Sequence, residues 1–208
     1  MEELESIFKT GCKWVVSATL PMFALMILFS KELLSIFGSG YADSAEVMRI
    51  LLIGQMVNVG TGSTGFILSM TGKSLFNLVN SGMLCFLNIG LTAVLVVRYG
   101  VLGAAWAYTV SIILIQLLQI VEVWYLYKMH PYRYDHLKSI LSCFASLAII
   151  YYLKNIINFP NILISTTILS TLFLMGYIML VVLAGFSPEE RMLFEKVQAK
   201  VRGHYNRT

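Results

Sequence analysis

The chain has 208 residues, of which 58% are hydrophobic and only 12% charged, and its mean hydropathy is +0.77. This composition excludes an ordinary soluble domain and is typical of a polytopic α-helical membrane protein, because apolar runs near the roughly 20 residues that cross a bilayer recur along the chain. A β-barrel would need short alternating segments, which none of the runs provides. The formal net charge of +4 is modest and its basic residues are dispersed, so nucleic acid is not an expected partner.

Six apolar runs predict six transmembrane helices. They cover about residues 12–30, 43–70, 74–97, 100–127, 137–153 and 162–184. We therefore expect an all-α fold, with a six-span membrane domain over residues 1–184 and a cytoplasmic amphipathic tail over residues 185–208. Two further amphipathic pieces are expected at the membrane surface: one or two turns over residues 2–9, and an interfacial helix that begins at Ser30 and ends at Gly38.

The second span carries a stripe of small and amide residues. On an ideal helix, at about 100° per residue, one sector of about 120° holds Gly54, Gln55, Asn58, Thr61, Gly62, Gly65 and Ser69. An amide without a partner is costly in hydrocarbon, so Gln55 and Asn58 are expected to face either other helices or a water-filled cavity. Arg49 starts this span nearly opposite the stripe, and it is either a positional anchor or an anion contact for a phosphate-bearing substrate.

The third span has a polar stripe of its own. Asn77, Ser81, Asn88 and Thr92 lie within about 60° of one another on a helical wheel. Its amides are again candidates both for hydrogen bonds between helices and for the lining of a cavity.

Small residues predict close packing of the second and fourth spans against their neighbours. A helix backbone can approach another closely where side chains are small. The candidate packing positions are Gly62, Gly65, Gly103, Ala104 and Ala107.

Glu122 is the only carboxylate well inside a span. It either snorkels or pairs with Lys128 or another helix, or it takes part in coupling or substrate passage. Gln116 and Gln119 align less well with this side of the fourth span. Spans five and six contain no charge and no amide in their interiors, with Lys138 at the start of the fifth, so we expect them at the periphery of the bundle.

Signals for catalysis and metal binding are weak. The stretch Thr71-Gly72-Lys73-Ser74 resembles the end of a phosphate-binding loop, but that motif needs glycine where this chain has Ile67. His130 and His136 flank a loop without a third well-placed ligand. No catalytic residue, cofactor or metal is therefore expected, and the protein is not expected to be an enzyme.

The distribution of basic residues predicts the topology. With six spans both termini lie on one side, and that side holds 11 of the 15 basic residues. The other side holds Lys31, Arg49, Arg98 and Lys154. By the positive-inside rule, both termini of a multi-pass protein of the cell membrane are then cytoplasmic.

Several segments, taken in order, resemble the C-terminal part of the prokaryotic polysaccharide flippases, which share a superfamily with lipid II flippases and multidrug and toxin extrusion exporters. The resemblance covers about residues 1–184 and rests on Pro21, FSKELLSIFGSGYADSAEVMRILLIGQ, ILSMTGKS and YGVLGAAWAYTVS. Its recognisable pieces are Ile36-Phe37-Gly38-Ser39-Gly40-Tyr41 and Gly100-x-x-Gly103-Ala104-Ala105.

The resemblance implies the last part of a two-lobed transporter, four helices of its C-terminal lobe and an extra pair. Such a transporter flips a lipid-linked oligosaccharide for surface polysaccharide biosynthesis by alternating access. The candidate cavity residues are Arg49, Gln55, Asn58, Asn77, Asn88 and Glu122. Expected partners are membrane lipid, the lipid-linked sugar, and a second membrane chain or N-terminal lobe that supplies the missing helices. The alternative is a non-transporting membrane subunit or truncated fragment that packs against a partner membrane protein.

Overall fold

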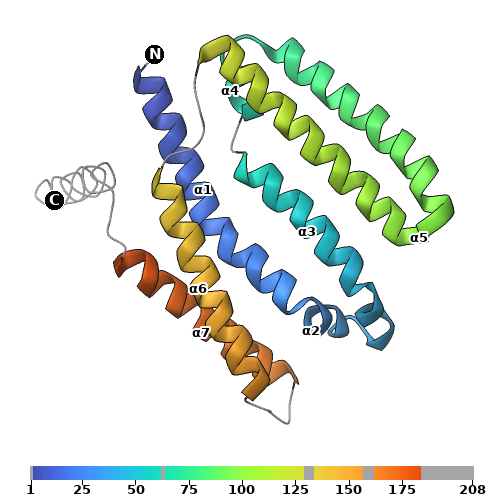
Figure 1. Ribbon diagram of the computed structural model, residues 1–208, viewed down its shortest axis with the longest axis vertical. Coiled ribbons are helices and arrows are strands. Elements are labelled where there is room, and N and C mark those ends of the chain that lie inside the picture. Colours follow the sequence, from blue (N-terminus) through green and yellow to red (C-terminus); the bar gives the residue numbers. More distant parts are fainter. Residues whose placement is uncertain (1, 62–63, 129–133, 157–161, 184–208) are drawn as a thin grey trace, which may run out of the picture.

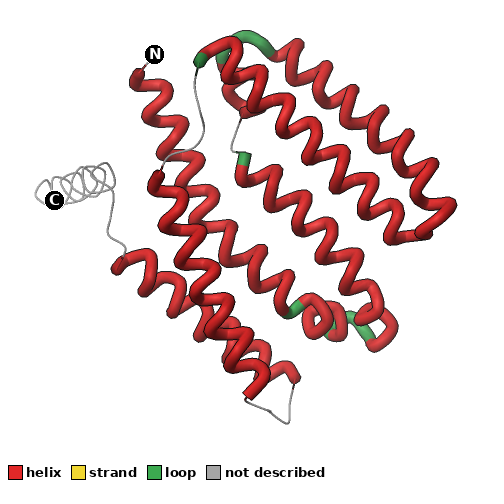
Figure 2. Tube along the Cα trace, viewed as in Figure 1, coloured by secondary structure: helices red, strands yellow, loops and turns green. Residues whose placement is uncertain are grey.

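The computed structural model describes residues 2–61, 64–128, 134–156 and 162–183, and these residues are helical apart from short turns (Figures 1 and 2). The elements are α1 (Glu2–Leu28), α2 (Ser30–Ser35), the 3-10 helix η1 (Ser39–Ser44), α3 (Ala45–Gly60), α4 (Thr64–Met70), α5 (Ser74–Tyr127), α6 (Tyr134–Ile156) and α7 (Ile162–Leu183). The predicted all-α fold is thus confirmed for the described part of the chain. The predicted tail over residues 185–208 lies outside it.

In the described part of the chain, three helices are long and apolar enough to cross a membrane. The qualifying windows are Gly11–Leu28 in α1, Ser74–Tyr127 in α5 and Thr166–Leu183 in α7. The apolar stretch of α6, Ile140–Leu153, is shorter, and α3 has only 16 residues. These lengths are compatible with a membrane location.

The N-terminal region differs from its expected form. Residues 2–9 do not form a separate surface piece, because α1 runs without interruption from Glu2 to Leu28 with Pro21 inside it. The sequence between the two expected pieces offers only Gly11 as a breaker. One glycine costs a helix interior about 1 kcal/mol, which is too little to end a long helix.

The second predicted span is divided. The 3-10 helix η1 precedes it, α3 ends at Gly60, and α4 begins at Thr64. Glycine and the β-branched threonine are both poor helix formers, and they meet at this end of α3. The residues predicted to form one stripe on a single ideal helix are therefore divided between two helices, α3 and α4.

Helix α5 is a hairpin. Its 54 residues include one non-helical position, Gly100, with φ 58° and ψ −134°. A side chain rarely adopts this backbone conformation, so glycine allows the chain to reverse there. We call residues 74–99 the first arm and residues 101–127 the second arm. The arms lie antiparallel and side by side (Figure 1), and a Cβ atom added at Gly103 would overlap the backbone carbonyl of Leu95.

The helices are arranged roughly as a row (Figure 1). Helix α1 packs against α6 and α7 on one side and against α3 on the other, and α3 and α4 in turn pack against α5. The largest apolar cluster joins α1, α6 and α7, and it consists of Leu20, Ala24, Phe29, Cys143, Ile150, Leu169, Phe173 and Tyr177. Among the described residues, α6 and α7 make no contact with α5, so they lie at one edge of the row.

Candidate functional site: a polar seam between α3–α4 and α5

The amides of α3 face the second arm of α5 and form hydrogen bonds with it. We call the whole set the polar seam, and it consists of Gln55, Asn58, Thr61, Thr64, Tyr108, Gln116 and Gln119. Gln55 Nε2 donates to the Tyr108 hydroxyl at 2.7 Å, and Asn58 Nδ2 donates to Gln55 Oε1 at 3.0 Å. Gln116 Nε2 donates to Asn58 Oδ1 at 2.5 Å. Each of these three bonds therefore pairs an amide NH2 donor with an oxygen acceptor.

The seam continues across the point where α3 ends and α4 begins. Thr61 Oγ1 lies 3.0 Å from Gln116 Oε1, and Thr64 Oγ1 lies 3.2 Å from Gln119 Oε1. Both threonines are buried. Two glutamines on adjacent turns of α5 thus bind the last turn of α3 and the first turn of α4 to the same neighbour.

Of the two surroundings expected for Gln55 and Asn58, interhelical hydrogen bonding is what the structure shows. In membranes such bonds contribute about 0.6 kcal/mol each on average, so the seam stabilises the pairing of α3 with α5 mainly as a set. Both side chains are only half-buried, so part of each lies at the surface of the described bundle.

Close packing accompanies the seam. A Cβ atom at Gly54 would lie 3.1 Å from Thr109 Oγ1 and 3.2 Å from the Ile112 side chain. Thr109 Oγ1 also donates to the carbonyl of Ile50 at 2.9 Å, which ties the second arm of α5 to the backbone of α3.

The predicted packing positions behave differently from one another. Ala107 is fully buried, Ala104 is half-buried, and Gly103 allows the two arms of α5 to touch. A Cβ at Gly65 would lie 3.2 Å from Asn77 Oδ1, so Gly65 makes room for the first arm. Gly62 lies outside the described residues.

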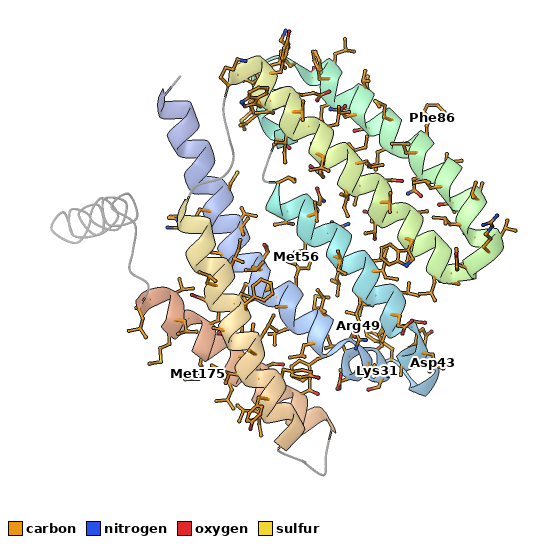
Figure 3. The ribbon with its side chains drawn as sticks, viewed as in Figure 1. Lys31, Asp43, Arg49, Met56, Phe86 and Met175 are labelled. Carbon is orange, nitrogen blue, oxygen red and sulfur yellow. The ribbon has the colours of Figure 1, made fainter. Side chains whose placement is uncertain are left out.

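Arg49 lies on a different face of α3 from the seam. Its Nε donates to the carbonyl of Ile27, in the last turn of α1, at 3.3 Å. A cation near the C-terminal carbonyls of a helix is favourable, so this bond satisfies one of the acceptors that α1 leaves unpaired. In Figure 3 Arg49 lies near Lys31 and Asp43, at the end of the bundle where α1 is joined to α3.

The amides of the first arm of α5 stand apart from the seam. Asn77 Nδ2 donates to Ser69 Oγ of α4 at 3.2 Å, and Asn88 Oδ1 accepts from Thr92 Oγ1 of its own arm at 2.9 Å. Both amides are half-buried, and Ser81 beside them is exposed. The two predicted stripes thus meet at the Asn77–Ser69 bond, whereas the bond of Asn88 stays within its own arm.

Glu122 pairs with a residue that the sequence reasoning did not select. Asn80 Nδ2, on the first arm, donates to Glu122 Oε2, on the second arm, at 2.6 Å. Asn80 is almost completely buried, and its Oδ1 has no hydrogen-bond partner. Lys128, which was considered as a partner for Glu122, instead lies over the ring of Trp124 at 4.7 Å from its centroid.

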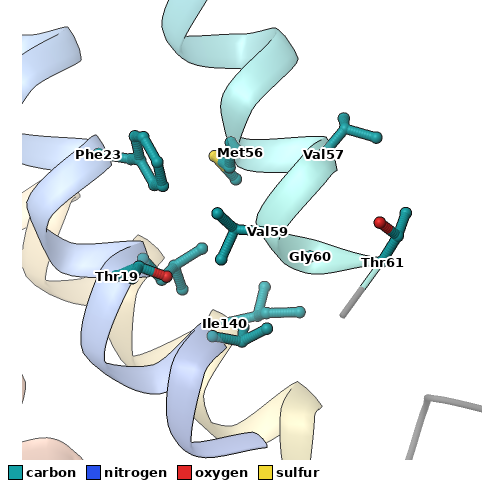
Figure 4. Close-up of a pocket in the computed structure, with 10 residues that line it drawn as sticks. Thr19, Phe23, Met56, Val57, Val59, Gly60, Thr61 and Ile140 are labelled. Carbon is teal, nitrogen blue, oxygen red and sulfur yellow. The ribbon is translucent and has the colours of Figure 1, made fainter. Parts of the chain in front are cut away.

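Two gaps open between α1, α3 and α6, and both are almost entirely apolar. One, of about 230 Å³, is lined by Phe23, Met56, Val59 and Ile140 among others (Figure 4). The other, of about 500 Å³, lies between Leu20, Met56 and Phe144. Thr61, at the edge of the first gap, is the one member of the polar seam among its lining residues (Figure 4).

Metal ligation has no support in the described residues, which contain no group of three or more His, Cys, Asp or Glu side chains. His130 and the side chain of His136, with the loop between them, fall outside the described set.

Sequence reasoning missed Asn80, Gln116 and Gln119. On a helical wheel Asn80 lies about 60° from Asn77, outside the polar stripe that was predicted for the third span. The available signal was chemical: an asparagine and a carboxylate occur on two helices joined by a short turn. Gln116 and Gln119 were set aside for poor alignment, although long side chains one turn apart can reach two successive turns of a neighbour.

The described fold defines an all-helical protein with helices of membrane-spanning length. No family model, curated protein or solved structure matches the chain. The resemblance to polysaccharide flippases therefore rests on the quoted sequence segments alone.

Proposed function

We propose that this chain is the C-terminal segment of a membrane transporter that flips a lipid-linked oligosaccharide. The observation that carries the proposal is the division of the row of helices. Helices α1, α6 and α7 share an apolar core, whereas α3 and α5 bring half-buried amides to the surface. The polar part of this row can form one wall of a transport cavity, and the other walls have to come from other helices.

Six crossings follow if each arm of α5 crosses once. An arm of about 26 residues would be about 39 Å long, at about 1.5 Å per residue, which exceeds the roughly 30 Å of hydrocarbon. Helix α1, α3 with α4, and α6 and α7 supply the other four. The positive-inside count then places both termini in the cytoplasm.

In this proposal the polar seam holds the cavity wall together and the first arm faces the cavity. Asn77 and Asn88 are the leading candidates, because they are half-buried and lie away from the seam. Gln55 and Asn58 would present to the cavity only the parts of their side chains that are not hydrogen-bonded within the seam. Arg49 would act from the membrane surface at the mouth.

Cysteine accessibility tests this assignment. In a variant whose three native cysteines are replaced, Asn88→Cys should react with a membrane-impermeant thiol reagent added to membranes. Phe86→Cys is the matched control, since Phe86 is 80% exposed on the same arm and points outward (Figure 3). Lipid is expected to cover Phe86 in the membrane, so the cysteine of Phe86→Cys should stay unmodified. Equal reactivity, or protection of Asn88→Cys, would remove the cavity assignment.

A second candidate function, a non-transporting membrane subunit, is favoured by one observation. Gln55 and Asn58 are already hydrogen-bonded within the chain, as expected of amides that only hold helices together. Reconstitution of the purified chain with a labelled lipid-linked oligosaccharide tests whether the chain transports without a partner. Movement of the label across the bilayer supports transport by the chain itself, and its absence supports a fragment or subunit that depends on a partner.

A further inference from the structure

The connection between α1 and α3 presents three large side chains that are mostly exposed in the described protein. It comprises α2, η1 and the turn between them, and its exposed fractions are 60% for Ile36, 75% for Phe37 and 58% for Tyr41. We propose that these three residues insert into the lipid surface at this end of the bundle and anchor the α1–α3 pair at a fixed depth. The inference rests on the membrane placement proposed above.

The fold directs these side chains outward. The opposite side of the connection is held by protein: Leu33 packs on the core of α1, α6 and α7, and Ser30 and Ala45, near its two ends, are buried. Between α2 and η1 the chain reverses at Gly38, with φ 132° and ψ 156°, a region that is essentially restricted to glycine. Gly38 O accepts from the Tyr41 amide at 3.1 Å, and a Cβ atom at Gly38 would lie 3.6 Å from Tyr41 Cδ2, so Tyr41 is held against this turn.

The position of the connection identifies its surroundings as lipid. It follows directly on α1, one of the helices long enough to span a membrane, so it lies at the depth where a spanning helix leaves the hydrocarbon. Aromatic side chains favour this depth, because their apolar rings and polar edges match the boundary between acyl chains and headgroups. Exposed charged residues of the same region can remain in water: Lys31 and Asp43 (Figure 3), and Glu46.

Charge argues against an anionic lipid as the specific ligand. Residues 29–49 contain two basic residues, Lys31 and Arg49, and three acidic ones, Glu32, Asp43 and Glu46. With a small acidic excess, attraction to anionic headgroups is not available. Insertion is therefore driven by the apolar surface of the three residues, and it should be the same in zwitterionic and in anionic membranes.

Site-directed spin labelling tests the inference on the full chain in phosphatidylcholine vesicles, with and without phosphatidylglycerol. Single labels are introduced at Phe37→Cys, Asp43→Cys and Met22→Cys in a cysteine-replaced background, with Ile36→Cys as a second anchor position. Collisions with oxygen report lipid, and collisions with a water-soluble nickel complex report water. We expect Phe37→Cys and Ile36→Cys to favour oxygen and Asp43→Cys to favour nickel. Added phosphatidylglycerol should change none of these three ratios of oxygen to nickel collisions.

The Met22 label distinguishes failure of the membrane placement from failure of the proposed anchor. Met22 is 63% exposed inside the membrane-length window of α1, so its label should favour oxygen strongly. If it favours nickel, the membrane placement itself fails. If Met22→Cys lies in lipid while both anchor labels favour nickel, only the anchor is overturned. Protection of the anchor labels from both reagents also overturns it, because a protein partner then covers the connection.

Discussion

At the scale of single residues, Gly54 shows how tightly α3 and α5 are fitted together. Gly54→Ala would place a methyl group 3.1 Å from Thr109 Oγ1 and 3.2 Å from the Thr109 backbone. We expect a loss of about 1–3 kcal/mol of unfolding free energy, as for other overpacked sites. The measurement is the unfolding midpoint in detergent micelles.

Gly60→Ala on the same helix is the matched control for Gly54→Ala. A Cβ at Gly60 would meet no other atom within 4 Å, and alanine favours the helix, so this variant should be neutral or slightly stabilised. Equal midpoints for the two variants would contradict the close approach of α3 to α5.

The Asn80–Glu122 pair allows a double-mutant cycle. Glu122→Leu removes the acceptor of the 2.6 Å bond and leaves a buried amide donor unpaired, which should cost about 1–3 kcal/mol. Glu122→Gln retains an acceptor and should cost less. Adding Asn80→Leu to Glu122→Leu should recover part of the loss, with a coupling of at least about 0.5 kcal/mol. Additive single effects would show that the two side chains do not interact.

At the scale of elements, the hairpin of α5 depends on contact between its arms near the turn. Gly103→Ala would force a methyl group into the Leu95 carbonyl, and since backbone cannot rotate away as a side chain can, we expect a loss of about 3 kcal/mol. Gly90→Ala, on the first arm with no atom within 4 Å of its Cβ, is the control. A Gly103→Ala variant as stable as Gly90→Ala would mean that the arms are further apart than described.

Local chemistry made some elements predictable from sequence. The turn at Gly100 was expected because Arg98, Tyr99 and Gly100 interrupt an apolar run. Gly38 was expected to end the interfacial helix, and α2 ends three residues before it, at Ser35. The separation of Arg49 from the amide stripe followed from helical periodicity, and Arg49 does bond toward α1 while the amides bond toward α5.

Tertiary choices were not predictable from sequence. Periodicity gives the face on which Gln55 lies, but not which helix covers that face. The amide partners Tyr108 and Gln116 are 53 and 58 residues away from Gln55 and Asn58 respectively. The division into α3 and α4 was missed because an ideal helix was assumed across Gly60 and Thr61, although both disfavour a helix.

At the scale of the whole molecule, the crossing of the membrane by each arm of α5 can be checked directly. Lys73 precedes the first arm and Arg98 lies at its far end, and both are exposed. In cysteine-replaced variants, Arg98→Cys should react with an impermeant thiol reagent in intact cells. Lys73→Cys should react only after permeabilisation. Reaction of both from the same side would exclude a transmembrane first arm.

The central position of α1 in the row also determines the order in which the protein can assemble during synthesis. The Tyr177 hydroxyl donates to the Ser17 carbonyl at 2.8 Å, across 160 residues of sequence, so α1 completes its packing only after α7 has been synthesised. The seam between α3 and α5 closes over much shorter separations and can form while α6 and α7 are still on the ribosome. Until they arrive, the side of α1 that contains Leu20 and Ala24 can be covered by lipid at little cost, since it is apolar. A nascent chain that stops after α5 should therefore already hold its amides in their final bonds.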